Sequence, residues 1–199
     1  MANTDAPFGF VPYGPVIHAE WYPLVTAVAT ACYVGDLMGA VNTGLVCAAF
    51  GGDTRMSVIS QYAGAAGDMM GFCIGLQDEN GDPVDHIAAS EAGDGVVAGY
   101  ALIADDPRQL ALAQEDGDTT PIAAASIGLN ADAISTHTPS AKNGYLSKME
   151  IDSNTVNTTA TLALRIVQSY KDDTVGSANC RFIVIIQPAA HFFSSATAV

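Results

Sequence analysis

The chain has 199 residues, of which 49% are hydrophobic and only 14% are charged. Globular domains usually carry about 25% charged residues, so small and uncharged polar residues must cover much of this surface, as suits a protein that works against other proteins. Seven Lys and Arg against 21 Asp and Glu give a net charge of −14, which argues against binding to phosphate backbones or anionic lipids. We therefore expect no nucleic-acid partner and no membrane partner.

The cysteines and the first residues indicate where the chain is made. None of the four cysteines, Cys32, Cys47, Cys73 and Cys180, forms a C-x-x-C pair, and each lies in an apolar stretch. Buried free thiols are therefore expected in preference to a disulfide framework. The opening MANTDAPFGF lacks the basic and apolar parts of a secretory signal, and the most apolar window, residues 24–34, is too short to span a bilayer. We expect synthesis in a cytoplasm without export by a cleaved signal.

Residues 1–23 are expected to form an extended arm. Four prolines and two glycines in this segment forbid a helix and disfavour an inner strand. The segment nevertheless carries five large aromatic residues: Phe8, Phe10, Tyr13, Trp21 and Tyr22. Such a segment lies across a surface and buries its rings there. The surface belongs either to the same chain or to a neighbouring molecule, and the sequence leaves both alternatives open.

Short strands separated by glycine are expected from residue 24 to about residue 115. Apolar runs of four to eight residues are bounded there by Gly-Asp and Asp-Gly pairs, and the strongest loop is DENGDP at 78–83. Within this tract, residues 96–103 and 108–114 predict two strands of a hairpin joined by Asp105-Asp106-Pro107. The two acids are interpreted as a turn that caps itself, because adjacent carboxylates on a turn point apart and make a poor catalytic pair.

The second half of the chain predicts one short helix and two further strands. Thr120 would cap the helix over 120–128, with Pro121 at its first position and Gly128 at its end. Residues 130–147 are expected to be a long loop. Segments 158–170 and 179–187 predict strands joined by a hairpin loop at 171–178.

These segments predict a mainly β protein with three parts. An extended Pro-rich arm covers residues 1–23, a small β-barrel or sandwich core covers 24–187, and a tail covers 188–199. The tail carries three residues, His191, Phe192 and Phe193, that are added to the arm aromatics as interface candidates.

Catalytic and metal signatures are weak throughout the sequence. The loop from Asp78 to Asp85 faintly resembles a calcium loop, but it lacks the twelfth-position Glu and the flanking helices of an EF-hand. No histidine has a partner four residues away, and there is no nucleophile elbow, P-loop or dinucleotide fingerprint. We therefore expect no catalytic residue, no cofactor and no metal, and a protein that is not an enzyme.

Several segments resemble a known family when they are taken together and in order. They include ANTDAPFGF near the start, GYALIADDPRQLALAQEDG, SIGLNAD, and YLSKMEIDSNTVNTTATLALRIVQ followed by GSANCRFIVIIQ. In this order they resemble the capsid decoration, or cement, proteins of tailed bacteriophages. The resemblance covers most of residues 1–187 and is strongest at 104–107, 127–132 and 149–164. The end, PAAHFFSSATAV, departs from the family pattern, which predicts a short polar tail.

The resemblance implies a β-rich virion protein that binds the outside of the head and holds neighbouring capsomers together. Its partner would be the major capsid protein, and it would form a homo-oligomer, with a trimer favoured. Two alternatives remain open. One is another virion component, such as a neck, tail or head-fibre attachment protein. The other is a free β-barrel enzyme or ligand-binding protein.

Overall fold

The computed structural model describes residues 3–25, 31–40, 46–48, 54–56, 58–60, 68–88, 97–171 and 173–194. The chain is mainly β, as the sequence predicts. Its described strands form two six-stranded sheets, here called sheet A and sheet B, and two ribbons of two strands each. The described residues contain no helix that is long and apolar enough to cross a membrane.

Sheet A is antiparallel and curls into a half-barrel. Its strands, in spatial order, are β1 (Val11–Pro12), β12 (Leu110–Gln114), β16 (Arg181–Ile186), β15 (Leu164–Ser169), β13 (Asn130–Ser135) and β14 (Met149–Asn157). The curl returns β14 towards β12, because Glu115, directly after β12, makes a bridge to Ile151 in β14. β1 remains at the edge of the sheet.

Sheet B closes into a small barrel. Its strands, in order, are β11 (Val97–Ala104), β2 (Glu20–Val25), β7 (Val58–Ser60), β4 (Leu37–Ala40), β8 (Met69–Asp78) and β9 (Pro83–Val84). β11 also pairs with β8, so the ladder from β11 to β8 returns to its starting strand. The two ribbons pair β3 (Cys32–Tyr33) with β10 (His86–Ile87), and β5 (Val46–Ala48) with β6 (Thr54–Met56).

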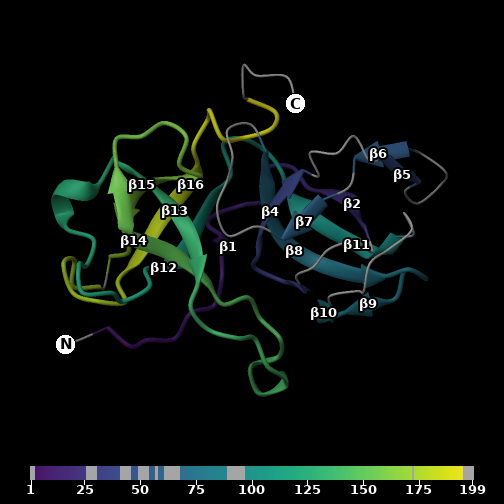
Figure 1. Ribbon diagram of the computed structural model, residues 1–199, viewed down its shortest axis with the longest axis horizontal. Helices are drawn as coiled ribbons and strands as arrows, with labels where there is room; N and C mark the ends of the chain where they lie inside the picture. Colours follow the sequence, from purple (N-terminus) through teal and green to yellow (C-terminus); the bar gives the residue numbers. More distant parts are fainter. Residues whose placement is uncertain are drawn as a thin grey trace.

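The two sheets lie side by side and share apolar core residues (Figure 1). The core of sheet A includes Leu37, Met69 and Phe72, which belong to β4 and β8 of sheet B. Phe10, in the arm, stacks on Phe72 with ring centroids 5.7 Å apart and is fully buried. A second core fills sheet B, where Leu24 and Ile103 are almost completely buried. The first core therefore holds the two sheets and the arm together.

The two strands and the turn expected from residues 96–114 are present, but the prediction of a hairpin is wrong, because β11 pairs with β2 and β8 while β12 pairs with β1 and β16. β11 belongs to sheet B, whereas β12 belongs to sheet A, so the turn at Asp105-Asp106-Pro107 carries the chain from one sheet to the other. The strand expected at 179–187 is confirmed as β16. The one expected at 158–170 is shorter, since β15 covers Leu164–Ser169.

Two predictions in the second half are wrong. The helix expected at 120–128 is only a 3-10 turn at Ala124–Ser126, without a side-chain cap. At the expected start of the helix, Thr120 does not act as the cap. The backbone N of Ile122 instead donates to the buried carboxylate of Glu115 at 2.7 Å. The loop expected at 130–147 begins with strand β13. The polar residues of this strand favoured a loop in the sequence. In the structure the Asp132 side chain instead accepts a hydrogen bond from the backbone N of Ala163.

The arm and the tail are both joined to the sheets. Part of the segment 1–23 is strand, because β1 pairs with β12 and β2 starts at Glu20 and pairs with β11. In the tail, His191 bridges to Met69, and Phe192 N donates to Met69 O at 2.7 Å. The expected free thiols are confirmed at three buried positions, Cys32, Cys73 and Cys180. The Cys47 side chain lies outside the described residues.

Candidate functional site

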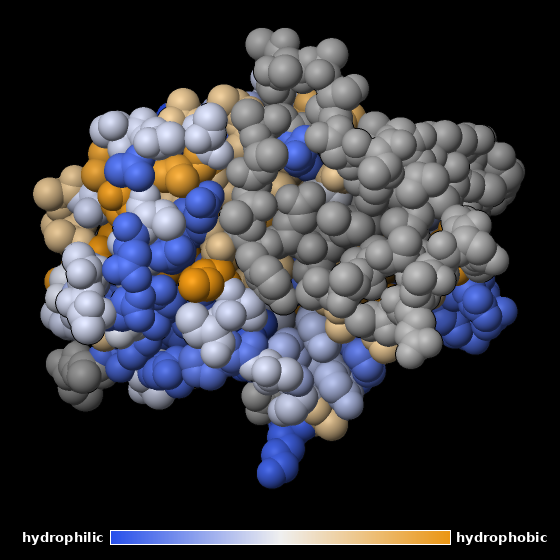
Figure 2. Space-filling model, viewed as in Figure 1, coloured by the Kyte–Doolittle hydropathy of each residue, from blue (hydrophilic) through white to orange (hydrophobic). Residues whose placement is uncertain are grey.

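The arm presents a run of exposed apolar side chains, which we call the apolar arm face. It consists of Val11, Tyr13, Val16 and Ile17, which are 45%, 42%, 43% and 48% exposed. On the face of the molecule drawn in Figure 2, hydrophobic areas over sheet A are small and are separated by hydrophilic residues. Four large apolar residues within the segment 11–17 are a denser group, of the kind that marks contact sites.

Backbone contacts hold the apolar arm face in place. Tyr13 N donates to Leu110 O at 2.8 Å, and Ile17 N donates to the side-chain oxygen of Gln109 at 3.0 Å. Because β1 is the edge strand of sheet A, this part of the arm lies on the sheet while its apolar side chains remain accessible. A pre-ordered surface of this kind loses less conformational entropy on binding than a loose peptide would.

A groove beside the arm extends this surface. It has a cavity volume of about 240 Å³, and its walls include Phe8 from the arm, Val34, Ile74 and the exposed Leu146. Leu146 belongs to residues 136–148, the segment between β13 and β14 that projects beyond the sheets in Figure 1. The apolar arm face and the groove therefore border each other through Val11, which contributes to both.

The structure divides the eight predicted interface residues into three groups. Phe10, Tyr22 and His191 are buried within the chain, so they make contacts with their own protein. Tyr13 and Phe193 are exposed, at 42% and 53%, while Phe8, Trp21 and Phe192 are partly buried. Phe192 and Phe193 pack edge to face, with centroids 5.2 Å apart. Some rings of the arm and the tail therefore fill the core of this chain, whereas others face outward.

The two acids of the turn between β11 and β12 have different roles. Asp106 accepts from the backbone N of Arg108 at 2.8 Å, and the Arg108 guanidinium lowers the pKa of this carboxyl to about 2. This confirms the self-capped turn. Asp105 is only 3% exposed and accepts at one oxygen from Tyr22 OH, 2.6 Å away. Its other oxygen lies 2.5 Å from His18 Nδ1, and this contact raises the pKa of His18.

A pocket of about 390 Å³ opens beside Asp105, with Glu20 and Phe193 also in its wall. A histidine oriented by a buried carboxylate is half of a general-base arrangement. The described residues that line the pocket include no serine, threonine or cysteine that could act as the nucleophile. The arrangement therefore ties the arm to the turn after β11, and it does not complete a catalytic set from its described lining.

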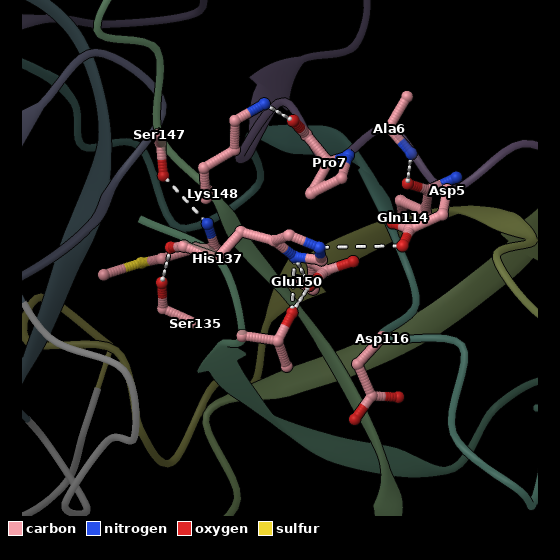
Figure 3. A network of polar contacts seen from close by, with 12 residues as sticks. Asp5, Ala6, Pro7, Gln114, Asp116, Ser135, His137, Ser147, Lys148 and Glu150 are labelled. Atoms are coloured by element: carbon pink, nitrogen blue, oxygen red, sulfur yellow. Dashed lines mark hydrogen bonds and ion pairs between the residues drawn. The ribbon is translucent and has the colours of Figure 1, made fainter. Parts of the chain in front are cut away.

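A second polar network joins the N-terminal segment to sheet A (Figure 3). His137 lies between two acids: its Nε2 is 3.6 Å from Asp5 Oδ2, and its Nδ1 is 3.5 Å from Glu150 Oε2. The Glu150 side chain has no exposed surface, and burial raises the pKa of its carboxyl. Thr136 donates its hydroxyl hydrogen bond to Glu150 Oε2. Ligand atoms from Asp5, His137 and Glu150 all lie within 4.8 Å of one another, which is close enough for a shared cation.

Three polar contacts bring the N-terminal segment to this network. Gln114, in β12, accepts from Ala6 N at 3.0 Å and donates to Thr4 O at 2.7 Å. Lys148 Nζ donates to Pro7 O at 2.5 Å. These contacts on both sides of Asp5 hold it beside the start of β14.

Sequence reasoning missed this network because its members are far apart in the chain. Residues 5, 137 and 150 have no motif spacing, and His137 was expected to lie in a long loop. One local signal was available: Glu150 stands between Met149 and Ile151, so a charged residue interrupts an apolar strand. The weak calcium interpretation of residues 78–85 gains no such support, since Asp78 Oδ1 accepts from the backbone of Asn80 and Asp82 as in a turn.

In comparisons with protein-family models, with curated proteins and with solved structures, nothing matches this chain.

Proposed function

We propose that this chain is a non-enzymatic structural protein of a bacteriophage head, which decorates the outer capsid surface and binds the major capsid protein. The observation that carries the proposal is the apolar arm face, which sheet A holds in place and leaves exposed. The groove beside it offers a concave apolar surface next to the exposed run. The resemblance of the ordered segments to decoration proteins supports the same role.

Burial of the apolar arm face would supply the binding free energy. Each 100 Å² of apolar surface removed from water contributes about 2.5 kcal/mol before the cost of association is subtracted. One copy binds modestly on this basis. A homotrimer, the oligomer we favour, would present three such faces and bind multivalently.

The charge of the chain fits an outward position on the particle. A net charge of −14 repels DNA, and so few Lys and Arg suit a protein that stays away from the packaged genome. The apolar arm face itself contains no charged residue, so contact there buries no unpaired charge.

The first test measures the chain in particles of the phage that encodes it. Quantitative mass spectrometry of purified particles should find hundreds of copies per head. About a dozen copies would instead indicate a neck or tail component. Absence of the chain from particles, together with a ligand-dependent rise in the melting temperature of the free protein, would indicate the ligand-binding alternative.

The second test uses add-back of purified chain to particles that lack it. Ile17→Asp places a charge in the apolar arm face and should weaken binding by about tenfold or more. Val167→Asp is the matched control: Val167 is 39% exposed on β15, which β12 and β16 separate from β1. Equal binding by both variants would overturn the assignment of the arm as the contact surface.

A further inference from the structure

We propose that Asp5, His137 and Glu150 form a binding site for a divalent transition-metal ion of the Zn²⁺ type. The site would lie where the N-terminal segment meets β14 and the segment before it (Figure 3). The proposal does not depend on the capsid role, because it rests only on contacts within this chain.

The spacing of the three side chains suits one shared ion. Their ligand atoms lie within 4.8 Å of one another, and His137 Nε2 is 3.6 Å from Asp5 Oδ2. A tetrahedral Zn²⁺ with bonds of about 2.0–2.2 Å keeps its ligand atoms about 3.3–3.6 Å apart. Asp5 and His137 are 52% and 44% exposed, so small side-chain movements can close the remaining difference and a water can take the fourth position.

The hydrogen bonds of His137 leave the lone pair of its neutral ring on Nε2, which is free to bind a metal ion. Thr136 uses its only hydroxyl proton on Glu150 Oε2, so its oxygen must accept at the 2.8 Å contact with His137 Nδ1. The neutral ring then carries its proton on Nδ1 and its lone pair on Nε2, the nitrogen that faces Asp5. A metal-binding histidine is typically held in this way, with the second nitrogen donating to a neighbouring oxygen.

The second observation is an unpartnered oxygen in the same group. Glu150 Oε1 is buried and has no hydrogen-bond partner among the described residues. The ion-pair contact of this side chain in the described part of the chain is with His137, while Lys148, two residues before it, donates to Pro7 O. A buried carboxylate without compensation is costly, and a bound cation would neutralise it.

The ligand types favour Zn²⁺ over calcium or magnesium. Imidazole together with carboxylates suits Zn²⁺ and related transition metals, whereas Ca²⁺ takes six to eight oxygen ligands and Mg²⁺ requires an octahedral oxygen set. The bound ion would link Asp5, in the N-terminal segment, to Glu150 in β14, and would so fix the start of the arm on sheet A.

The test titrates Zn²⁺ into the full-length protein after treatment with a chelator. Calorimetry should give one ion per chain, and Asp5→Asn and His137→Gln should each weaken the affinity by about tenfold or more. Both altered side chains are substantially exposed, so the variants should keep the wild-type circular dichroism spectrum. Ca²⁺ should bind much more weakly than Zn²⁺ in the same assay.

Two controls identify the ligands. His86→Gln is the matched variant, because His86 also contacts an acid, Asp85, at 2.8 Å but belongs to no three-residue group among the described residues. It should bind Zn²⁺ as the wild type does. Co²⁺ substitution should give no thiolate charge-transfer absorption, since cysteine takes no part. Absence of binding, an equal loss in His86→Gln, or a thiolate band would overturn the proposal.

Discussion

Tyr22 donates a hydrogen bond of 2.6 Å to Oδ2 of Asp105, a residue that lies 83 positions further along the chain. The bond ties β2 to the turn at which the chain leaves sheet B for sheet A. Since His18 contacts the other oxygen of the same carboxylate, the arm is attached to this turn at two points.

The first prediction concerns this attachment. Tyr22→Phe removes one donor from the buried Asp105 carboxylate and should lower the free energy of unfolding by about 1–3 kcal/mol. Tyr13→Phe is the control, because the Tyr13 ring is 42% exposed, and it should change stability by less than about 0.5 kcal/mol. Urea unfolding measures both. Equal stability of the two variants would show that the bond contributes nothing.

The second prediction compares two glycines of the arm that both have left-handed φ angles. Gly9 has φ +76° and Gly14 has φ +86°. A Cβ at Gly14 meets no atom within 4 Å, so Gly14→Ala should cost only the conformational term, about 1–2 kcal/mol. A Cβ at Gly9 would lie 2.5 Å from Ser147 Cβ and 2.6 Å from Gly35 O.

Gly9→Ala should therefore destabilise the protein clearly more than Gly14→Ala, because the arm would have to lift from the residues before β14. Thermal unfolding of the two variants at one pH measures the difference. If the two alanine variants unfolded at the same temperature, the close packing of the arm at Gly9 would have to be abandoned.

The third prediction concerns Glu115, whose burial raises the pKa of its carboxyl to about 7 although Ile122 N and Cys180 N donate to it. In the unfolded chain this acid ionises near its ordinary value of 4.5. Between pH 4.5 and 7 this carboxyl therefore binds fewer protons in the unfolded state than in the folded state, so the contribution of Glu115 to the free energy of unfolding should fall as pH rises.

Denaturant unfolding from pH 4 to pH 8 measures this slope. Glu115→Gln removes the titrating group, so its free energy of unfolding should fall less, or rise more, with pH in that window than that of the wild type, although the variant also loses one acceptor for the two backbone donors. Glu79→Gln, in an exposed loop, should leave the slope unchanged. An unaltered slope in Glu115→Gln would contradict the assignment.

The fourth prediction has the opposite sign. Burial lowers the pKa of His191 to about 4, its Nδ1 accepts from Phe193 N, and its Nε2 has no partner among the described residues. The unfolded chain takes up a proton at this histidine near pH 6.5, whereas the folded chain does not until about pH 4. The contribution of His191 to stability should therefore be lost as pH falls from 6.5 to 4, opposite to the contribution of Glu115 where the two pH ranges overlap.

His191→Phe should remove this acid-side loss, because an apolar ring in the same buried position has no proton to bind. The measurement is the difference in unfolding free energy between pH 7 and pH 4.5 for the wild type and the variant. If the variant lost as much stability as the wild type, other groups would control the acid transition.

The fold class could be predicted from the sequence because it depends on local signals, namely apolar runs and turn residues. Apolar runs such as the one that becomes β16 and the turn at Asp106-Pro107 appear where their residue types favour them. The sequence could not show that two sheets share the chain, since the pairing of β11 with both β2 and β8 depends on residues far apart.

The candidate sites were harder to predict than the strands. Phe10 and Tyr13 are both aromatic residues of one arm, yet one fills the core and the other is exposed. The difference arises from the path of the backbone along β12, which composition does not encode. The group of Asp5, His137 and Glu150 is likewise assembled only when the N-terminal segment docks on sheet A.

The docking of the first residues sets an order for biogenesis. Asn3 Nδ2 donates to Ala178 O, and Gln114, which holds Thr4 and Ala6, also donates to Asn179 O. Asn3 is thus synthesised well before its partner, which lies 175 positions further along the chain. This segment can dock only after those partners have been synthesised, as in proteins with high contact order, and the aromatic residues of the arm stay uncovered on the nascent chain in the interval.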